Sequence, residues 1–420
     1  MIIAPAWLET SSLFPVLISD KPGNDTGIIV VVPSFDESGI TDLLDSLRKC
    51  FPPSCKCEVL IIINAPGNAP SDTLDRNRET FEEIGIWTSN HRESFLKVYV
   101  ADLGQPGIKG WGVGLARKAG MDEAAKRFLT INRPDGVIAS MDADCTVSRN
   151  YFIALEKELL NKKNRSGCSI FFEHPIKGND FPDEVYRAVY QYELHLRYYF
   201  QALKYSGFPN VYHTVGSSMA VKTSSYIKAG GMNRNQAGED FYFIQKVVSA
   251  GGFFSLNSTS VFPSSRISNR VPFGTGVVVR KIISNPDNEL VTYNPLSFKD
   301  LKYFFERIGF FSDCSKEELV SQFEVFPESI RRFLTTNIWE EKITEIRSNT
   351  SGPETFKKRF FDWFNMFRVV KYLNYAHEEI FKKVPVSKAA KEILYLMGLD
   401  LSEAASKGYL EYFRSLEREG

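Results

Sequence analysis

A run of five consecutive β-branched residues, Ile28 to Val32, constrains the fold of this chain more than any other feature. Such a run is typical of a central strand of a parallel sheet, because side chains on both faces of that strand are buried. Pro33 ends the run, and an amphipathic helix is predicted from about Ile40 to Cys50. A second apolar run extends from Glu58 to Asn64. Strand, helix and strand in this order predict a right-handed βαβ unit.

The same alternation continues to about residue 276, so the sequence indicates an α/β protein. Beyond about Leu296 the strand signals end and helical patterns dominate. Further strands are predicted at 97–102, 137–141, 168–173 and 213–221, and helices at 115–128, 149–163, 183–204 and 241–250. We therefore divide the chain into a lead-in (1–26), an α/β domain (27–290) and a mainly α-helical C-terminal region (291–420).

Charge and composition exclude some classes of protein. The 420 residues carry 51 basic and 51 acidic side chains, so the chain lacks the basic excess of a nucleic-acid-binding protein. The N-terminus does not have the pattern of a signal peptide, and no apolar run is long enough to span a membrane. We interpret the six cysteines as free thiols in a reducing compartment, which predicts a cytoplasmic protein, although the sequence leaves a disulfide among them open.

Two acids follow the predicted strand at 137–141, at Asp142 and Asp144. In an extended segment, residues two apart point to the same side, so both carboxylates would face one hard cation. Magnesium and manganese are held in this way when a bound diphosphate supplies further oxygen ligands. The alternative interpretation is a strand end and turn that carry acids without a function.

Basic residues stand in two loop regions suited to phosphate. A glycine-rich loop at 104–114 precedes a helix that carries Arg117 and Lys118 in its first turns, and backbone N–H groups at such a place can bind phosphate. Arg266 and Arg270 lie in a loop at 262–276, where guanidinium groups suit a diphosphate. A flexible connection and surface arginines are the alternative interpretations.

Glu239 and Asp240 open another predicted helix, where acids also serve as ordinary N-terminal residues. His213 is a weak candidate for a third metal ligand or an acceptor contact, with a structural histidine as the alternative. The aromatic helix at 183–204 is a candidate floor for an acceptor groove or plain core. The basic and aromatic segment at 357–375 is a candidate peripheral membrane contact, with core or a subunit contact as the alternative, which leaves the oligomeric state open.

Four segments in this order resemble the glycosyltransferase family 2 domain over roughly residues 27–276. They are IIVVVPSFDE, ARKAGMDEA, SMDAD and VGSSMAVKTSSYIKAGGMNRNQAGED. The resemblance implies the GT-A fold, a Rossmann-like, mixed, mostly parallel sheet flanked by helices. It also implies a nucleotide-sugar donor and a divalent cation, Mn²⁺ or Mg²⁺.

The resemblance also implies roles for individual residues. Asp144 would bind the metal directly, and Asp142 would contact the ribose or a metal-bound water. One carboxylate of the Glu239–Asp240 pair would be the catalytic base, and we favour Asp240. Some positions depart from the family: Asp36 stands where Asn is usual, Asn64 where Asp is common, Lys118 where Asn is common, and Val271 where Trp is usual. The donor-binding residues implied are Pro33, Phe35, Glu37, Asn64, Arg117, Lys118, Asp142, Arg266 and Arg270.

These features together predict an inverting transferase that moves a sugar from a nucleoside-diphosphate donor, with a UDP-sugar favoured, to a hydroxyl acceptor. A saccharide or lipid-linked acceptor in polysaccharide or glycolipid synthesis is expected, at the inner membrane face if lipid-linked. A sugar nucleotidyltransferase is one alternative, but it needs a phosphate-binding loop after the first strand, where this chain has acidic residues and no glycine until Gly39. A nucleotide-sugar-binding protein without turnover is the other.

Overall fold

The computed structural model describes residues 6–10, 12–91, 95–108, 111–233, 238–267, 275–285 and 289–419. The chain forms two compact units. The sheet unit comprises residues 1–189, 212–281 and 418–420, and the helical unit comprises residues 190–211 and 282–417. The helical unit therefore takes residues 190–211 from inside the range 27–290 that the sequence suggested as one domain.

The sheet unit is built on an eight-stranded sheet with the order β3-β2-β1-β4-β7-β6-β8-β5. Strands β3, β2, β1 and β4 run parallel, β7 is antiparallel to both β4 and β6, β8 is parallel to β6, and β5 is antiparallel to β8. Only β7 and β5 thus oppose the other described strands of this sheet. The strands are β1 (Thr26–Ser34), β2 (Lys56–Ile63), β3 (Leu96–Asp102), β4 (Val137–Ser140), β5 (Thr146–Val147), β6 (Gly167–Phe172), β7 (Met219–Lys222) and β8 (Phe253–Phe262).

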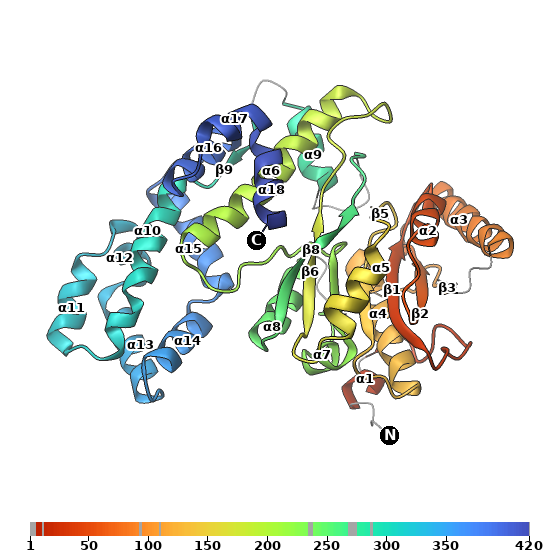
Figure 1. The fold of residues 1–420 in the computed structure, drawn as a ribbon, viewed down its shortest axis with the longest axis horizontal. Coiled ribbons are helices and arrows are strands. Elements are labelled where there is room, and N and C mark those ends of the chain that lie inside the picture. Colours follow the sequence, from red (N-terminus) through yellow and green to blue (C-terminus); the bar gives the residue numbers. More distant parts are fainter. Residues whose placement is uncertain are drawn as a thin grey trace. The chain divides into compact units, whose positions relative to one another are not determined.

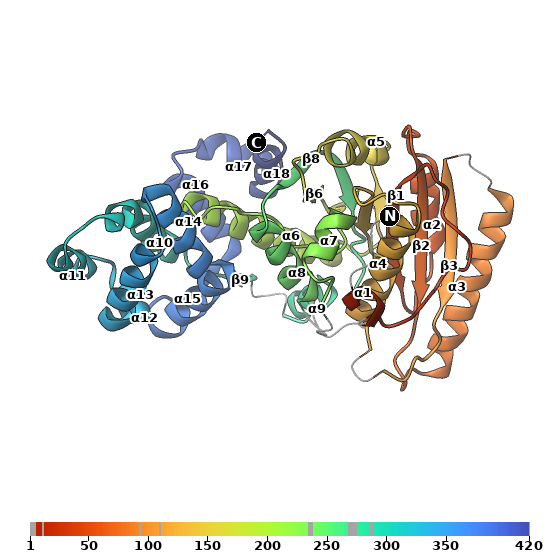
Figure 2. The same ribbon diagram turned by 90° about the horizontal axis from the view of Figure 1, so that it is seen from below.

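Helices lie on both faces of this sheet, as Figures 1 and 2 show. The helices of the sheet unit are α1 (Ala6–Thr10), α2 (Ile40–Arg48), α3 (Ser71–Asn90), α4 (Val113–Thr130), α5 (Tyr151–Leu155) with a π-helical extension (Glu156–Leu160), the start of α6 (Asp183–Tyr205), α7 (Thr223–Lys228), α8 (Glu239–Ser249) and most of α9 (Thr275–Ile283). Every residue of β1 is buried, which confirms the two-sided burial expected from its β-branched run. The predicted class, an α/β protein with a mixed, mostly parallel sheet flanked by helices, is confirmed.

Helix α4 packs closely on β1, β2 and β4. A side chain at Gly120 would place its Cβ only 2.4 Å from Val31 Cγ1 and 2.9 Å from Ile62 Cγ1. Glycine at this position therefore lets the helix backbone approach the sheet. The approach fixes α4, which carries Arg117.

The N-terminal lead-in packs against α4 instead of lying loosely beside the domain. Leu8 is fully buried in the core of the sheet unit. The backbone N–H of Leu17 donates to Glu123 at 3.1 Å, and Arg127 Nη1 donates to the carbonyl of Asp20 at 2.7 Å. The sequence did not reveal this because the lead-in has no regular periodicity.

One predicted strand is shorter in the structure, and one long strand was not predicted. The strand expected at 213–221 is confined to Met219–Lys222, because residues 215–218 form a turn closed by the N–H of Ser218 and the carbonyl of Val215. Strand β8 was missed, since its apolar pattern is interrupted where the pairing with β6 shifts register between Ile170 and Phe171.

The helical unit confirms the predicted α-helical C-terminal region (Figure 1). Its aromatic core surrounds Trp339, which is fully buried and lies 4.9 Å from Phe311 and 5.5 Å from Phe326 between ring centroids. A short antiparallel ladder pairs β9 with β10. Its elements are the rest of α6, β9 (Val291–Thr292), α10 (Pro295–Arg307), a 3-10 turn (Ile308–Ser312), α11 (Lys316–Glu324), α12 (Glu328–Leu334), α13 (Thr336–Ser348), α14 (Pro353–Trp363), α15 (Met366–Glu379), β10 (Val384–Pro385), α16 (Val386–Leu396), α17 (Leu401–Lys407) and most of α18 (Tyr409–Glu419).

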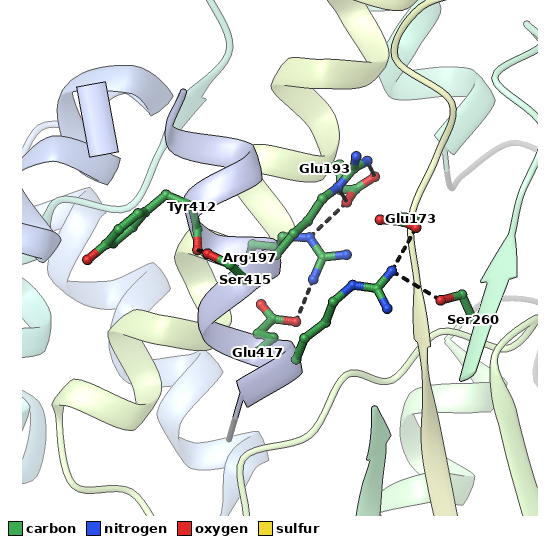
Figure 3. A network of polar contacts seen from close by, with 9 residues as sticks. Glu173, Glu193, Arg197, Ser260, Tyr412, Ser415 and Glu417 are labelled. Carbon is green, nitrogen blue, oxygen red and sulfur yellow. Dashed lines mark hydrogen bonds and ion pairs between the residues drawn. The ribbon is translucent and has the colours of Figure 1, made fainter. Parts of the chain in front are cut away.

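A buried ion-pair network joins α6 to α18 within the helical unit. Arg197 lies between Glu193 and Glu417, with hydrogen bonds of 2.8 and 2.5 Å (Figure 3). Glu193 also accepts two hydrogen bonds from Arg414, at 2.8 and 2.7 Å. Each carboxylate therefore has a guanidinium partner, which offsets the cost of burying charge.

The segment 357–375 is not one continuous helix. It is divided between α14 and α15, and the side chain of Asn365 caps α15 by accepting from the N–H of Arg368. Phe360 and Phe364 are fully buried in the helical unit. Their burial favours the core interpretation of these aromatic side chains over a membrane-facing stripe.

Within the described ranges, no helix is both long enough and apolar enough to cross a membrane. All six cysteines are free thiols, as the sequence analysis expected.

Candidate active site

The acidic residues after β4 lie in a turn, which we call the acidic turn (Asp142–Cys145). Strand β4 ends at Ser140, and the N–H of Cys145 closes the turn on the carbonyl of Asp142 at 3.2 Å. The expectation of an extended segment is therefore wrong, because the two acids lie in a turn. Asp142 pairs with Arg117, whereas Asp144 pairs with Arg266.

Arg117 links the acidic turn to the start of α8. Its Nη2 donates to Asp142 Oδ1 at 2.6 Å, and its Nη1 donates to Glu239 Oε1 at 2.7 Å. The guanidinium and Glu239 are almost completely buried, with 5% and 3% of their side chains exposed, whereas Asp142 is 42% exposed. Burial lowers the pKa of Arg117, but the surrounding carboxylates outweigh it and raise the pKa overall. Arg117 is thus a permanent positive charge that fixes two carboxylates from distant parts of the chain.

Asp240 is held beside this cluster by two backbone donors. Its Oδ2 accepts from the N–H of Gly216 at 3.0 Å, and its Oδ1 accepts from the N–H of Phe241 at 2.7 Å. Burial raises the pKa of Asp240, and burial likewise raises the pKa of Glu239, while Arg117 opposes both shifts. Asp240 remains partly exposed, so it is the more accessible carboxylate of the pair.

Gly216 has no room for a side chain. A Cβ at this position would lie 2.9 Å from Arg117 Nη1 and 3.0 Å from Asp240 Oδ2. The guanidinium and the carboxylate therefore flank the same point on the Gly216 backbone. Sequence analysis did not single out Gly216, and its only signal was a glycine inside the strand predicted at 213–221.

Arg266 forms the second cluster. Its Nη1 and Nη2 donate to the two carboxylate oxygens of Glu37, with the Nη2 contact at 2.6 Å, and its Nη2 also lies 2.8 Å from Asp144 Oδ2. Glu37 is 3% exposed and Arg266 is 21% exposed. Burial lowers the pKa of Arg266, but the hydrogen bonds to Glu37 and the charge of Asp144 outweigh this effect, so that the pKa is raised overall. Two residues predicted to bind the donor thus contact each other.

The two clusters combine five carboxylates with two guanidinium groups among the described residues. The carboxylates belong to Glu37, Asp142, Asp144, Glu239 and Asp240, and the guanidinium groups to Arg117 and Arg266. Carboxylate oxygens are ligands that magnesium and manganese prefer, which is compatible with a cation beside a bound diphosphate.

The acidic turn fits a cation that shares its coordination with a substrate. Asp142 and Asp144 offer hard oxygen ligands from one turn. No group of three or more His, Cys, Asp or Glu residues with metal-binding geometry occurs in the described part of the chain. Magnesium often binds through one or two carboxylates plus substrate phosphates and water, so two protein ligands suffice for this type of site.

Asn64 and Lys118 serve the scaffold in this structure. The buried side chain of Asn64 donates to the carbonyl of Ser34 at 3.0 Å and accepts from Trp111 Nε1 at 2.7 Å. Lys118 pairs with buried Asp122 at 2.8 Å. The side-chain polar atoms of both residues bind neighbouring groups of the sheet unit, so the function proposed below assigns no donor contact to either residue.

The other predicted residues have mixed placements. Pro33 is buried near the end of β1, and Phe35 follows the strand partly buried. His213 packs edge-on against Phe172, with 5.2 Å between ring centroids. Arg270 lies outside the described residues. The structure therefore brings together Glu37, Arg117, Asp142, Asp144, Glu239, Asp240 and Arg266.

No protein-family model matches the chain, and neither does any curated protein. Solved structures similar to it include S. aureus TarS residues 1–349 in complex with UDP-GlcNAc, which is 12% identical, with a TM-score of 0.39 over 79% of this chain and 89% of that chain. GalNAc-T7 with UDP, GalNAc and Mn²⁺ is 13% identical, with a TM-score of 0.39 over 82% of this chain and 59% of that chain. Similarity at this level carries no argument about activity, so the function is argued from the residues of the site.

Proposed function

We propose that this protein is an inverting glycosyltransferase of the GT-A type that transfers a sugar from a nucleoside-diphosphate donor to a hydroxyl acceptor. One observation carries the proposal: Arg117 joins Asp142 of the acidic turn to Glu239, next to Asp240. The proposed diphosphate and cation site would then lie beside Asp240, a carboxylate whose pKa is raised by burial. This combination serves group transfer from a phosphorylated donor.

The donor half of the proposed site consists of the acidic turn and Arg266. Asp144, with Asp142, would hold Mn²⁺ or Mg²⁺, and the cation would neutralise charge that develops on the departing nucleoside diphosphate. Arg266 would bind the diphosphate through its guanidinium, whose Nε has no hydrogen-bond acceptor among the described residues. Arg270, in the same loop, belongs to this half by the sequence resemblance alone.

Asp240 is the better candidate for the catalytic base. Glu239 is buried and bound to Arg117, so its carboxylate is committed to an ion pair. Asp240 is partly exposed, and its raised pKa makes it a stronger base than an ordinary aspartate. In the proposed step Asp240 accepts the proton of the acceptor hydroxyl as that oxygen attacks the anomeric carbon. The C–O bond to the diphosphate breaks on the opposite face, which inverts the configuration.

The donor and acceptor are proposed by class. A UDP-sugar is the favoured donor, and a saccharide or lipid-linked hydroxyl in polysaccharide or glycolipid synthesis is the favoured acceptor. The six free cysteines support a reducing, cytoplasmic location.

Thermal unfolding in a panel of nucleoside diphosphates and nucleotide-sugars, with and without Mn²⁺, tests the donor half. A ligand at about one hundred times its dissociation constant adds about 2.7 kcal/mol of stability, or roughly 5 °C or more for a unit of this size. We expect one nucleotide to give such a shift only with Mn²⁺ and the Asp144→Asn variant to lose it. If every nucleotide leaves the unfolding temperature unchanged in the wild type, the proposal is wrong.

A further inference from the structure

Arg266 contacts one carboxylate oxygen of Asp144, the residue proposed above to bind the cation. Its Nη2 lies 2.8 Å from Asp144 Oδ2, while both terminal nitrogens also bind Glu37. A divalent ion bound to this carboxylate would stand close to the positive guanidinium. Because like charges at such separations repel strongly, Arg266 and the cation compete for Asp144.

A diphosphate can resolve this competition. Its oxygens accept two parallel hydrogen bonds from a guanidinium, and the buried Nε of Arg266 has no acceptor of its own within the described ranges. Glu37 is almost completely buried and holds both terminal nitrogens. Arg266 therefore has to exchange only its contact with Asp144 and can stay in the site.

We propose that Arg266 is a positioning residue that couples cation binding to nucleotide binding, which rests on the function proposed above. In the absence of a nucleoside diphosphate, Arg266 pairs with Asp144 and weakens cation binding. The diphosphate draws the guanidinium from Asp144 to its own oxygens, which lowers the repulsion between Arg266 and a cation bound to that carboxylate. Each ligand thus strengthens the binding of the other, and the coupling is reciprocal.

The decisive quantity is the affinity for the cation without a nucleotide. A diphosphate that ligates the metal would produce some coupling even without Arg266, so coupling alone does not test the proposal. Removal of Arg266 should instead improve cation binding, a gain that damage to the fold would not produce. The probe is Mn²⁺ alone, measured by isothermal titration calorimetry on the full chain.

We expect Arg266→Met to bind Mn²⁺ at least about tenfold more tightly than the wild type, within the usual 5–150-fold range of coupling between two ligands. With saturating Mn²⁺, the same variant should bind UDP at least about tenfold more weakly, because the guanidinium no longer contacts the diphosphate. The matched control is Arg76→Met. Arg76 binds Asp36, the neighbour of Glu37, so this variant also removes one positive charge near the site. Its affinity for Mn²⁺ should change less than about threefold, because solvent and salt screen charges that are not in contact.

Two results would overturn the proposal: no gain in Mn²⁺ affinity in Arg266→Met, or an equal gain in Arg76→Met, which would show a general effect of charge. If Arg266→Met does not fold, Arg266→Lys replaces it. A lysine keeps the charge but cannot bind Glu37 and Asp144 together, so a smaller gain is expected and no gain refutes the coupling. The Mn²⁺ measurement needs no nucleotide. Suppose that Arg266→Met binds Mn²⁺ more tightly than the wild type, but the wild type binds no nucleotide. That result would refute the transferase proposal and would leave the competition at Asp144 intact.

Discussion

Substitution of Gly216 by alanine tests whether the spacing of Arg117 and Asp240 matters for catalysis. The new methyl group would lie 2.9 Å from Arg117 Nη1 and 3.0 Å from Asp240 Oδ2, where ordinary contact begins at 3.4 Å. The backbone of Gly216 does not have a positive φ, so alanine meets no conformational strain of its own. The effect of the substitution is therefore confined to these two side chains.

The expected size of the effect follows from this crowding. Overpacking of a filled site lowers the free energy of unfolding by about 1–3 kcal/mol. Replacement of glycine by alanine also reduces the conformational entropy of the unfolded chain, which raises the free energy of unfolding by about 0.4–1 kcal/mol. We predict a net loss of about 1–2 kcal/mol, or a decrease of about 2–8 °C in the unfolding temperature. Displacement of Asp240 should lower kcat by about 100-fold, because misplacement of a catalytic group by about 1 Å has effects of that order.

The assay compares kcat, donor affinity and the unfolding temperature of Gly216→Ala with those of Gly85→Ala. Gly85 lies at an exposed position of helix α3, and a Cβ there meets no atom within 4 Å. The control should gain up to about 1 kcal/mol of stability from helix propensity and keep its activity. Wild-type kcat in Gly216→Ala would refute the assignment of Arg117 and Asp240 to one catalytic arrangement.

Three further predictions concern single side chains. Arg117→Met should destabilise the sheet unit by about 3–5 kcal/mol in urea unfolding, because it leaves buried Glu239 unpaired. The control Arg78→Met removes an exposed ion pair and should change stability by less than about 1 kcal/mol. Similar losses of stability in both variants would contradict the argument. Burial lowers the pKa of His195 to about 4, so its neutral form stabilises the folded helical unit above about pH 6.5 and this contribution, up to about 3 kcal/mol, is lost as the pH falls towards 4. His195→Gln should flatten that part of the stability curve, and an unchanged curve would count against the explanation. Burial raises the pKa of Asp240, so transfer should fail on the acid side at a pH above the ordinary aspartate pKa of about 3.9. The contribution of Asp240 to stability should decrease as the pH rises from that value through the raised pKa of the folded protein. A rate that stays constant down to pH 4 would exclude Asp240 as the base.

The central strands were predictable because their composition alone determines their place. A strand with apolar side chains on both faces, such as Ile28–Val32, must be covered on both faces of the sheet. Every residue of β1 is buried, as this composition requires. The bulged pairing of β8 was not predictable, since it depends on the partner strand β6. The helices from α10 onwards were evident as a class, but no sequence pattern indicated that residues 190–211 pack with them.

The candidate site was predictable in residue type and only partly in geometry. The acids at 142, 144, 239 and 240 were recognisable as a set from their order along the chain. Their partners were not, because Arg117 and Glu239 are separated by 122 positions and meet only after the sheet has formed. The amide of Asn64 binds the carbonyl of Ser34, and the ammonium of Lys118 binds Asp122. Which partner such a side chain binds depends on its burial in the folded protein, so residue type alone does not predict it.

The central claim is that Asp240 acts as the base of a nucleotide-sugar-dependent transferase. The most direct test is to measure donor affinity and sugar transfer, with water or a supplied hydroxyl as acceptor, for the wild type and Asp240→Asn with Mn²⁺. The account predicts donor affinity within about threefold of the wild type and a turnover lower by about 10²–10⁴-fold, the usual contribution of a general base. Unchanged turnover in Asp240→Asn, or a wild type that binds the donor and never transfers its sugar, would contradict it.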